Sequence, residues 1–269
     1  MTDAGPAMLL YEHPLSSYAQ KVKIALREKG VTFETAVPRG IGVGGAAGEF
    51  VAANPRAEVP ALIHDSVAIF DSTIILEYIE DAWPKPSLLP ATPADRARVR
   101  MIEEVVDTHL EAVNWGLSEL RWFRRAEGPL GDALSTRAGE QVRGYYSWLE
   151  RELGDREWFN GEAFGWGDLS VVPYVNGSVG HGIAPEPGSK LAIWLARANA
   201  RQSVRDTVAE AAATASSGGM GDVAKLLEQG LFKREYRDHR LEWMVKSGGL
   251  EVVTQGMARG NIRFTPDLV

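Results

Sequence analysis

The sequence predicts a small α/β domain followed by an all-α domain, and three observations lead to this fold class. From about Ala7 to Ala82, short apolar runs alternate with segments of helical spacing, as in a small sheet covered by helices. After about residue 93, apolar residues recur almost only at helical spacing. Residues 84–93 include four prolines, which is the composition of a linker. We therefore expect domains over 1–83 and 93–269, joined by a linker over 84–92.

In the first domain we expect a strand, a helix, a strand, a short helix, a hairpin and a final helix. Their expected ranges are 7–11, 17–29, 31–37, 49–55, 60–70 with a turn at 65–66, and 71–83, with a glycine-rich loop over 40–48. Gly30 supplies a C-cap for the first helix, and Asp71-Ser72 begin the last one. Helical spacing predicts that Ile74, Ile75 and Tyr78 face inward.

The second domain begins at a capping box, Thr92-Pro93-Ala94-Asp95, with proline at the first helical position. Three apolar series then keep helical spacing: Ile102, Val106, Leu110, Val113 and Leu117; Val142, Tyr145, Leu149 and Leu153; and Leu191, Trp194, Leu195 and Ala198. Beyond about residue 203 we expect further helices, broken by glycines at 218–221, 248–249 and 260.

Composition excludes several classes of function. The 269 residues are 45% hydrophobic and 24% charged, the balance of a soluble globular protein, and neither a secretory leader nor a membrane-length apolar run is visible. We expect a cytoplasmic protein with no membrane partner. A net charge of −7 disfavours a nucleic-acid partner, and the cluster of Arg121, Arg124 and Arg125 is interpreted as a solvated helix face. Because cysteine is absent and the five histidines have no paired spacing, we expect no metal site.

Four segments, in this order along the chain, resemble sequence signatures of one enzyme superfamily. They are SSYAQKVKIAL (16–26), NPRAEVPAL (54–62), FDSTIILEYIEDAWP (70–84) and GEAFGWGDLSVVPYV (161–175). Each segment alone is a weak motif, whereas four of them at the family spacing are specific over about residues 8–205. On these residues the chain resembles the cytosolic glutathione transferase superfamily, and in particular a bacterial member that uses a catalytic serine, as the tau and zeta classes do.

The resemblance implies a thioredoxin-like first domain, with a mixed four-stranded sheet and helices, that binds glutathione as a co-substrate. The all-α second domain would supply a pocket for a hydrophobic electrophile, which the glutathione thiolate attacks, and two chains would pair as a homodimer. The same thiolate serves substitution, conjugate addition, ether cleavage, isomerisation and peroxide reduction. The reaction subtype therefore stays open.

Hydroxyl groups at the first strand–helix junction are the candidates for activating the thiol. A thiol pKa near 8.5 has to fall by roughly two units, which takes about 2.7 kcal/mol. One hydroxyl hydrogen bond to the anion supplies roughly 1.5–3 kcal/mol, and a helix N-terminus up to about 1–2 kcal/mol more. The resemblance aligns Ser16 with the catalytic serine and makes Ser17 a secondary donor. The alternatives are that both serines only cap the helix, or that Tyr11 or Tyr18 is the donor.

Glutathione itself would be held around the hairpin and the helix that follows it. In the family, the proline at Val59-Pro60 is cis, and the backbone of the preceding residue pairs with the cysteinyl unit like an added strand. The helix N-terminus at Asp71-Ser72 suits the γ-glutamyl carboxylate, and the Asp71 carboxylate suits the ammonium group. Asp71 is shorter than the usual glutamate, and Ser72 has the alternative role of an N-cap alone.

Glu58 departs from the family pattern. Many relatives carry glutamine or lysine just before the Val-Pro pair, where the side chain meets a carboxylate of glutathione, and an acid there would repel it. Either Glu58 turns outward, or Arg39, Arg56 or another basic residue neutralises it. Arg39 and Glu58 are therefore both candidate glutathione-binding residues.

The resemblance places the electrophile pocket against the first long helix of the second domain. Trp115, Trp122 and Phe123 fall there, and with Tyr11 they are the candidate pocket residues, although aromatic residues on such helices are often only core.

Two later features are interpreted structurally. Asp168 is expected to cap a buried helix, although the serine or threonine usual three residues earlier is Gly165. The tail that carries Arg263 and Phe264 either folds across the cleft or is a frayed end.

Two other classes of function stay open. Glu58 and the incomplete cap at Gly165 are compatible with a non-catalytic glutathione- or ligand-binding protein of the same fold. A structural component of a larger assembly would bind no glutathione at all. Turnover of an aryl electrophile separates the transferase from the first alternative, and glutathione binding separates it from the second.

Overall fold

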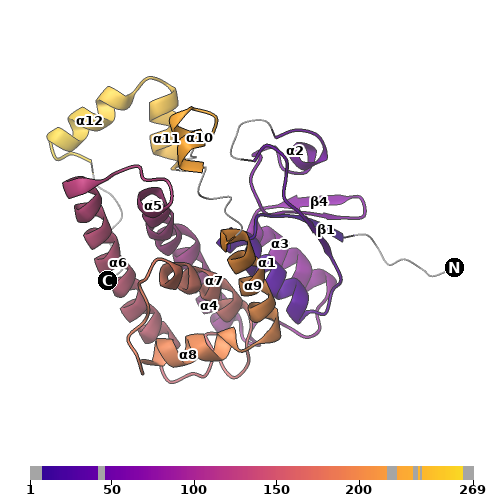
Figure 1. The fold of residues 1–269 in the computed structure, drawn as a ribbon. Helices are drawn as coiled ribbons and strands as arrows, with labels where there is room; N and C mark the ends of the chain where they lie inside the picture. Colours follow the sequence, from indigo (N-terminus) through magenta and orange to yellow (C-terminus); the bar gives the residue numbers. More distant parts are fainter. Residues whose placement is uncertain (1–7, 42–45, 217–222, 233–235, 237, 263–269) are drawn as a thin grey trace.

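The computed structural model describes residues 8–41, 46–216, 223–232, 236 and 238–262. A sheet with its helices forms one side of the molecule, a bundle of longer helices forms the other, and the last helices lie beyond α5 (Figure 1). Of the sequence-based expectations, part of the loop over 40–48, the glycines at 218–221, and Arg263 with Phe264 lie outside the described residues.

Four strands form one mixed sheet in the order β2-β1-β3-β4. Their bounds are Met8–Tyr11 for β1, Glu34–Ala36 for β2, Ala61–His64 for β3 and Val67–Phe70 for β4. β2 is parallel to β1, while β3 is antiparallel to both β1 and β4. This topology confirms the expected mixed sheet. β2 is shorter than predicted, because Val31 and Phe33 pack against the core without joining the ladder.

Three helices accompany the sheet: α1 over Ser17–Glu28, α2 over Glu49–Ala53 and α3 over Ser72–Ala82. α1 is the central one, since it packs against α3 on its own side and against α7 and α9 of the helical bundle. Every residue of α1 from Ala19 to Leu26 is buried, including Lys21 and Lys23. The helix that begins at the candidate serines is therefore enclosed by both halves of the molecule.

The prediction that Ile74 faces inward is wrong. Its side chain is 56% exposed, whereas Ile75, Leu76 and Ile79 are buried. At 100° per residue these three share an arc of α3 with Ser72, and Ile74 lies nearly opposite that arc. Ile75 is buried as predicted, and Tyr78 is partly buried against the core.

The helical half is built from α4, a π-helical turn (η1) and α5 to α9. Their bounds are Pro93–Val105, Val106–Leu110, Glu111–Arg121, Gly128–Leu153, Trp166–Gly180, Lys190–Asn199 and Gln202–Ser216. The predicted cap at Thr92 forms, with its hydroxyl accepting from the Asp95 N–H at 3.1 Å. The apolar series that the sequence gives as one helix is interrupted by the π-helical turn, so α4 and α5 are separate elements.

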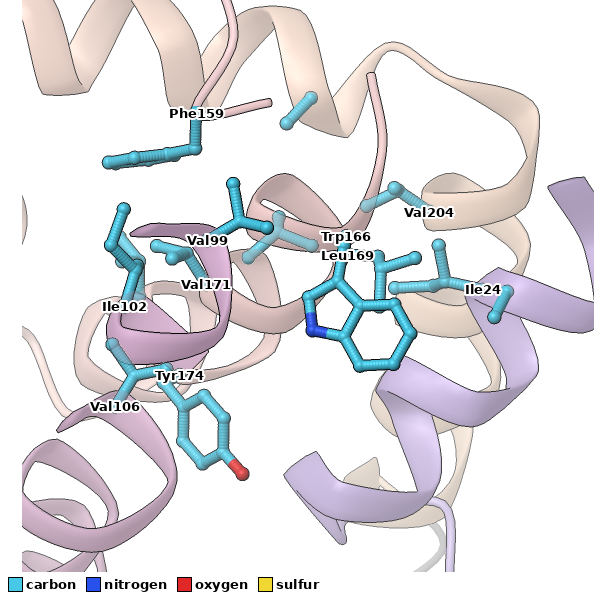
Figure 2. Packing of buried hydrophobic residues seen from close by; sticks show 14 of the residues in the cluster. Ile24, Val99, Ile102, Val106, Phe159, Trp166, Leu169, Val171, Tyr174 and Val204 are labelled. Carbon is cyan, nitrogen blue, oxygen red and sulfur yellow. The ribbon is translucent and has the colours of Figure 1, made fainter. Parts of the chain in front are cut away.

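The core of this half surrounds α7, which is buried on nearly all sides. Figure 2 shows Trp166 and Tyr174 of α7 among apolar side chains that come from several elements, including Ile24 of α1 and Val204 of α9. Because one core includes side chains of α1, α7 and α9, the sheet half and the helical half share it.

The capping box of α7 is incomplete because Gly165 stands at its N-cap position. The Asp168 carboxylate accepts the Gly165 N–H at 3.1 Å, which is the half of the box that the sequence retains, and it also accepts the Phe159 N–H at 2.8 Å and the Trp194 Nε1–H at 2.8 Å. A Cβ at Gly165 would lie 2.4 Å from the carbonyl oxygen of Leu88. Glycine therefore stands here because the linker backbone occupies the space of a side chain.

The segment between α3 and α4 is fastened to both halves. Lys29 Nζ donates to the carbonyl oxygens of Trp83 and Pro86, each at 2.6 Å. The Leu88 N–H donates to Glu80 at 3.1 Å, and the Leu88 carbonyl accepts the Trp166 N–H at 2.7 Å. α3 ends at Ala82 and α4 begins at Pro93. The domain boundaries at 83/84 and 92/93 stay a prediction.

Three helices follow the bundle: α10 over Val223–Glu228, α11 over His239–Lys246 and α12 over Leu250–Ala258. Many of their large apolar side chains are exposed, among them Leu241, Trp243, Leu250, Val252 and Met257. None of the helices in the described ranges combines the length and apolar content that crossing a bilayer needs.

Candidate active site

Three connections meet at one end of the sheet, and the strand register places them there. Tyr11, the last residue of β1, pairs with Ala61, the first residue of β3, and Ala61 pairs in turn with Phe70, the last residue of β4. The junction from β1 to α1, the Val59-Pro60 peptide and the start of α3 are therefore neighbours. These connections carry the candidate residues for glutathione.

Ser16 is the N-cap of α1. Its Oγ accepts the Ala19 N–H at 3.3 Å, and its backbone N–H donates to the His13 carbonyl at 2.8 Å. Gln20 braces the same turn, because its Nε2 donates to the carbonyl oxygen of Pro14 at 2.8 Å. Ser16 is thus both a cap and a partly exposed hydroxyl.

The capping bond leaves the Ser16 hydroxyl able to donate. A serine hydroxyl has one O–H and two lone pairs, and the bond from Ala19 uses only a lone pair. Within the described part of the chain, no group accepts the Ser16 O–H, and none forms a hydrogen bond with the Ser17 hydroxyl. The two serines therefore present free donors at the helix N-terminus, where the backbone dipole favours an anion.

The two tyrosines that compete with Ser16 are held elsewhere. The Tyr11 hydroxyl donates to Glu49 at 3.1 Å, and partial burial together with the Glu49 carboxylate raises the pKa of Tyr11. The Tyr18 hydroxyl donates to the carbonyl oxygen of Asp107 at 2.6 Å. Either tyrosine would have to give up this bond to donate to a bound thiolate.

The Val59-Pro60 peptide is cis, which confirms that prediction. Its approach is braced by the buried side chain of Asn54, which accepts the Arg56 N–H at 3.0 Å and donates to the Glu58 carbonyl at 2.7 Å. Between the two, Ala57 has a positive φ of 55°. Among the described residues no hydrogen bond uses the N–H or C=O of Val59, so Val59 offers both of its backbone groups to a ligand.

Asp71, and not Ser72, is the N-cap of α3. Its Oδ1 accepts the Thr73 N–H at 3.1 Å and the Ile74 N–H at 3.5 Å, so part of the helix terminus is already satisfied by the protein. Ser72 is buried at the first helical position, and no described residue bonds to its hydroxyl. The Ser72 hydroxyl at the N-terminus of α3 therefore has no hydrogen-bond partner among the described residues.

The charge of Glu58 is offset by Arg56. Arg56 Nε lies 3.7 Å from Glu58 Oε2, and Arg56 Nη2 lies 3.5 Å from Asp71 Oδ2. Arg39, the other basic residue proposed for this role, is exposed in the turn after β2 and makes no ion pair with a described residue. Of the two named candidates, the structure brings only Arg56 to Glu58.

A buried charge cluster beneath the serines is a feature that the sequence analysis missed. Lys21 Nζ pairs with Glu103 Oε1 at 2.6 Å and with Asp107, while Thr73 Oγ1 donates to the same Glu103 oxygen at 2.9 Å. One ammonium group faces two carboxylates, so burial and the neighbouring Glu103 raise the pKa of Asp107 to about 6. Glu103 and Asp107 are one helical turn apart in the sequence, but nothing local identifies Lys21 as their partner.

A second cluster holds the other buried lysine of α1. Lys23 Nζ lies 3.0 Å from Glu12, just before the serine turn, and 2.8 Å from Glu210 of α9. Burial raises the pKa of Glu12 although Lys23 opposes the shift. The helix that carries Ser16 is therefore tied to the helical half at two points.

The aromatic residues expected to line the electrophile pocket do not face one another. The Trp115 ring of α5 packs against Tyr236 with centroids 4.5 Å apart, and Phe123, just beyond α5, stacks on Phe232 at 5.8 Å. The Trp122 ring lies against the His181 ring, with centroids 5.0 Å apart. Residues of the chain after α10 thus pack against two of the four predicted pocket residues, Trp115 and Phe123.

Comparison with known proteins agrees with this arrangement. Residues 10–87 match the family model described as glutathione S-transferase, N-terminal domain. Glutathione S-transferase U28 of Arabidopsis thaliana is 30% identical over 206 residues, which are 72% of this chain and 85% of that protein. Maleylacetoacetate isomerase of Pseudomonas aeruginosa is 28% identical over 66% of this chain and 84% of its own.

Solved structures of glutathione transferases also have this fold. Rice GST1 in complex with glutathione superposes with a TM-score of 0.67 at 26% identity, over 82% of this chain and 97% of that one. The fold and the site define a protein with a thioredoxin-like half and an all-α half. The chain belongs to the glutathione S-transferase family.

Proposed function

We propose that this protein is a glutathione transferase in which the Ser16 hydroxyl donates a hydrogen bond to the thiolate of bound glutathione. The supporting observation is that Ser16 caps α1 with a lone pair and keeps its O–H free, at the end of the sheet where the unpaired N–H and C=O of Val59 also lie. In this arrangement the Val59 backbone pairs with the cysteinyl unit, and the thiol proton passes to solvent.

The proposed activation is a difference in hydrogen bonding to the two forms of the sulfur. A hydroxyl bonded to a charged acceptor is stabilising by roughly 1.5–3 kcal/mol, and a thiol pKa falls one unit for each 1.36 kcal/mol gained by the anion. The N-terminus of α1 adds a favourable dipole. Together these reach the roughly two units that make thiolate the main form at pH 7.

The test is the ultraviolet thiolate absorbance of bound glutathione, titrated from about pH 5 to 9. We expect a midpoint below about 7 for the wild type and a return toward 8.5 for Ser16→Ala, with binding retained. Ser17→Ala is the matched control, because it removes a neighbouring hydroxyl and should move the midpoint much less. If the Ser16→Ala midpoint equals that of the wild type, Ser16 does not donate to the thiolate, and Tyr11 becomes the candidate donor.

The activated sulfur then attacks an electrophilic carbon, forming a carbon–sulfur bond as the leaving group departs. We propose an apolar or aromatic electrophile that contacts the aromatic side chains of the helical half. The test is turnover of an aryl halide: glutathione binding with a lowered midpoint and no turnover of any electrophile supports the non-catalytic binding protein instead.

Isomerisation is a second candidate, favoured by the relationship to the isomerase of Pseudomonas aeruginosa. A thiolate that adds to a double bond and leaves again permits rotation without net consumption of glutathione. Assays with a cis-configured unsaturated diketo acid, following glutathione concentration alongside product, separate this reaction from transfer: glutathione is consumed only in the transfer.

We also propose a homodimer. Val67, Phe70, Ile74 and Met101 are exposed apolar residues on β4, α3 and α4. α3 and α4 are joined by the bidentate Glu77–Arg100 pair, at 2.8 and 2.9 Å, so Ile74 and Met101 flank one surface that a second copy would cover. Light scattering should give twice the 29.4 kDa of one chain, and Ile74→Glu should shift the protein toward the mass of one chain.

A further inference from the structure

A cavity of about 840 Å³ lies where the C-terminal end of α1 meets α8 and the start of α9. Residues of these three helices line it, together with Trp158 from the loop between α6 and α7. A helix rises about 1.5 Å per residue, so Arg27, in the wall of the cavity, lies roughly 16 Å along α1 from Ser16. The cavity is therefore separate from the candidate active site.

Three arginines from different elements line the cavity, namely Arg27 of α1, Arg197 of α8 and Arg201 just before α9. Arg197 and Arg201 stack on the ring of Trp158, with their Cζ atoms 5.4 and 5.8 Å from its centroid. Arg201 also stacks on Phe164, at 4.5 Å. Stacking fixes the plane of a guanidinium without using its N–H groups. Two of the three guanidinium groups are therefore oriented by aromatic rings.

The protein uses only part of each stacked guanidinium. Arg201 Nε and Nη2 donate to Glu28 at 2.9 and 2.7 Å, and no described residue accepts from Nη1. Arg197 Nη1 donates to the carbonyl of Glu157 at 2.6 Å, and Nη2 has no acceptor in the described part of the chain. Arg27 bonds to α9 through both Nη atoms and contributes its charge. Arg197 and Arg201 therefore keep N–H donors for a ligand.

Other N–H groups without acceptors line the same cavity. Trp158 is 7% exposed, yet no described residue accepts from its indole Nε1–H. At the start of α9, the backbone N–H groups of Gln202 and Ser203 also lack an acceptor among the described residues. Buried N–H groups are almost always paired, and a helix N-terminus attracts anions. These donors point to a ligand that is rich in acceptors.

Two carboxylates line the cavity as well, and protein donors occupy both. Glu28 accepts from Arg201 and from the Ser203 hydroxyl, while Asp206 accepts from the Gln202 amide at 2.5 Å. The groups left for a ligand are therefore mainly N–H donors. The planar fork of arginine matches the oxygens of a phosphate group in bidentate geometry.

We propose that this cavity binds the phosphate group of a small organic phosphate ester between the two halves of the protein. Arg197, Arg201 and the start of α9 bind the phosphate oxygens, and the Trp158 indole donates a further hydrogen bond. Small-molecule sites hold roughly 300–1,000 Å³, so the cavity has room for an organic group beside the phosphate. Val31 and Ala200 supply apolar lining for that group.

The test is calorimetric titration of the full chain with phenyl phosphate and with inorganic phosphate, at one pH and one ionic strength set with sodium chloride. We expect both to bind, the ester more tightly. Arg197→Gln should raise both Kd values about 10- to 100-fold, because it removes a charge-assisted donor. Arg197→Lys, which keeps the charge without the fork, should lie between Arg197→Gln and the wild type. Trp158→Phe, which removes only the indole donor, should raise them about 2- to 10-fold.

Arg137→Gln is the matched control, because Arg137 is also exposed and lies 3.7 Å from a glutamate, on α6. It should bind both ligands as the wild type does, and thermal unfolding checks that each variant is folded. The proposal is overturned if the wild type binds neither ligand or if folded Arg197→Gln binds both normally. An unchanged Kd in Trp158→Phe removes the indole from the site.

Two further outcomes separate this site from its alternatives. Equal affinities for the two ligands would assign the cavity to the free phosphate ion and overturn the part of the proposal that concerns an ester. Displacement of phenyl phosphate by saturating glutathione would place the anion at the candidate active site and overturn the proposal. Binding that persists beside glutathione supports it, and phosphate binding by a chain that does not bind glutathione would overturn the proposed function alone.

Discussion

Lys21 and Lys23 of α1 are both fully buried, two residues apart on one helix, yet their surroundings differ. Lys21 meets Glu103 and Asp107, whose side chains are 2% and 12% exposed. Lys23 meets the buried Glu12, but its other partner, Glu210, is 42% exposed. The stability lost on removing a buried lysine therefore depends on whether the carboxylates left behind can reach water.

Lys21 and Lys23 also differ in how each holds the turn that carries Ser16 and Ser17. Lys21 lies one turn beyond Ser17 and fixes α1 against α4, η1 and α3 through Glu103, Asp107 and Thr73. Lys23 fixes the turn before Ser16, through Glu12, and α9. We therefore expect Lys21 to govern stability and Lys23 to govern the placement of the serine turn more than stability.

Lys21→Met should have the largest effect. Methionine fills similar volume but leaves two buried carboxylates without a counter-charge, so we expect the free energy of unfolding to fall by about 3–5 kcal/mol. Urea unfolding followed by tryptophan fluorescence measures it. Lys190→Met is the control, since Lys190 and Asp155 are both exposed and solvent screens their ion pair, so this variant should unfold as the wild type does. If Lys21→Met and Lys190→Met lowered the free energy of unfolding equally, burial of the Lys21 ion pairs would add nothing to stability.

Lys23→Met should come second, at roughly 1–3 kcal/mol, because Glu210 can turn to solvent and only Glu12 stays buried. The same unfolding measurement applies. If Lys23→Met lowered the free energy of unfolding more than Lys21→Met does, the exposure of Glu210 would not explain the difference between the two lysines.

The Lys21 cluster should also show a pH dependence that can be isolated with Asp107→Asn. The folded pKa of Asp107, about 6, is above its unfolded value near 3.8, so the folded state binds the proton more tightly. This contribution to stability is fully present below about pH 4 and is lost as the pH rises to about 6. The stability of Asp107→Asn relative to the wild type should therefore increase over that interval, and a constant difference would contradict the raised pKa.

Glu210→Gln should have the smallest effect, below about 1 kcal/mol, because its ion pairs with Lys23 and Arg27 are partly exposed to solvent. Thermal unfolding at low and high salt measures it. If this variant loses as much as Lys23→Met, the partner's exposure is not what separates the two lysines.

The order of elements was predictable because it depends on local periodicity and on caps such as Gly30 and Thr92. The exposure of Ile74 was not, since an apolar residue on a helix does not reveal which arc faces the core. Gly165 was recognised as a gap in a capping box, but its cause, the Leu88 carbonyl, lies far away in sequence.

In the candidate site, too, motifs predicted local features but not contacts between distant segments. Ser16, the cis Val59-Pro60 peptide and Asp71 were found from motifs, because motifs record backbone geometry. The partners Arg56–Asp71 and Lys21–Asp107 join segments that only the folded chain brings together.

The segment between Trp83 and Pro93 bears on how ligands exchange. Lys29 holds the carbonyls of Trp83 and Pro86, and α7 holds that of Leu88, so these hydrogen bonds oppose hinge motion between Trp83 and Leu88. If the protein acts as proposed, a conjugate would then leave while the two halves stay together, so side chains and loops around the proposed site would govern its residence time. A protease that requires a pliable stretch should likewise find no cleavage point between Trp83 and Pro93, despite the linker-like composition.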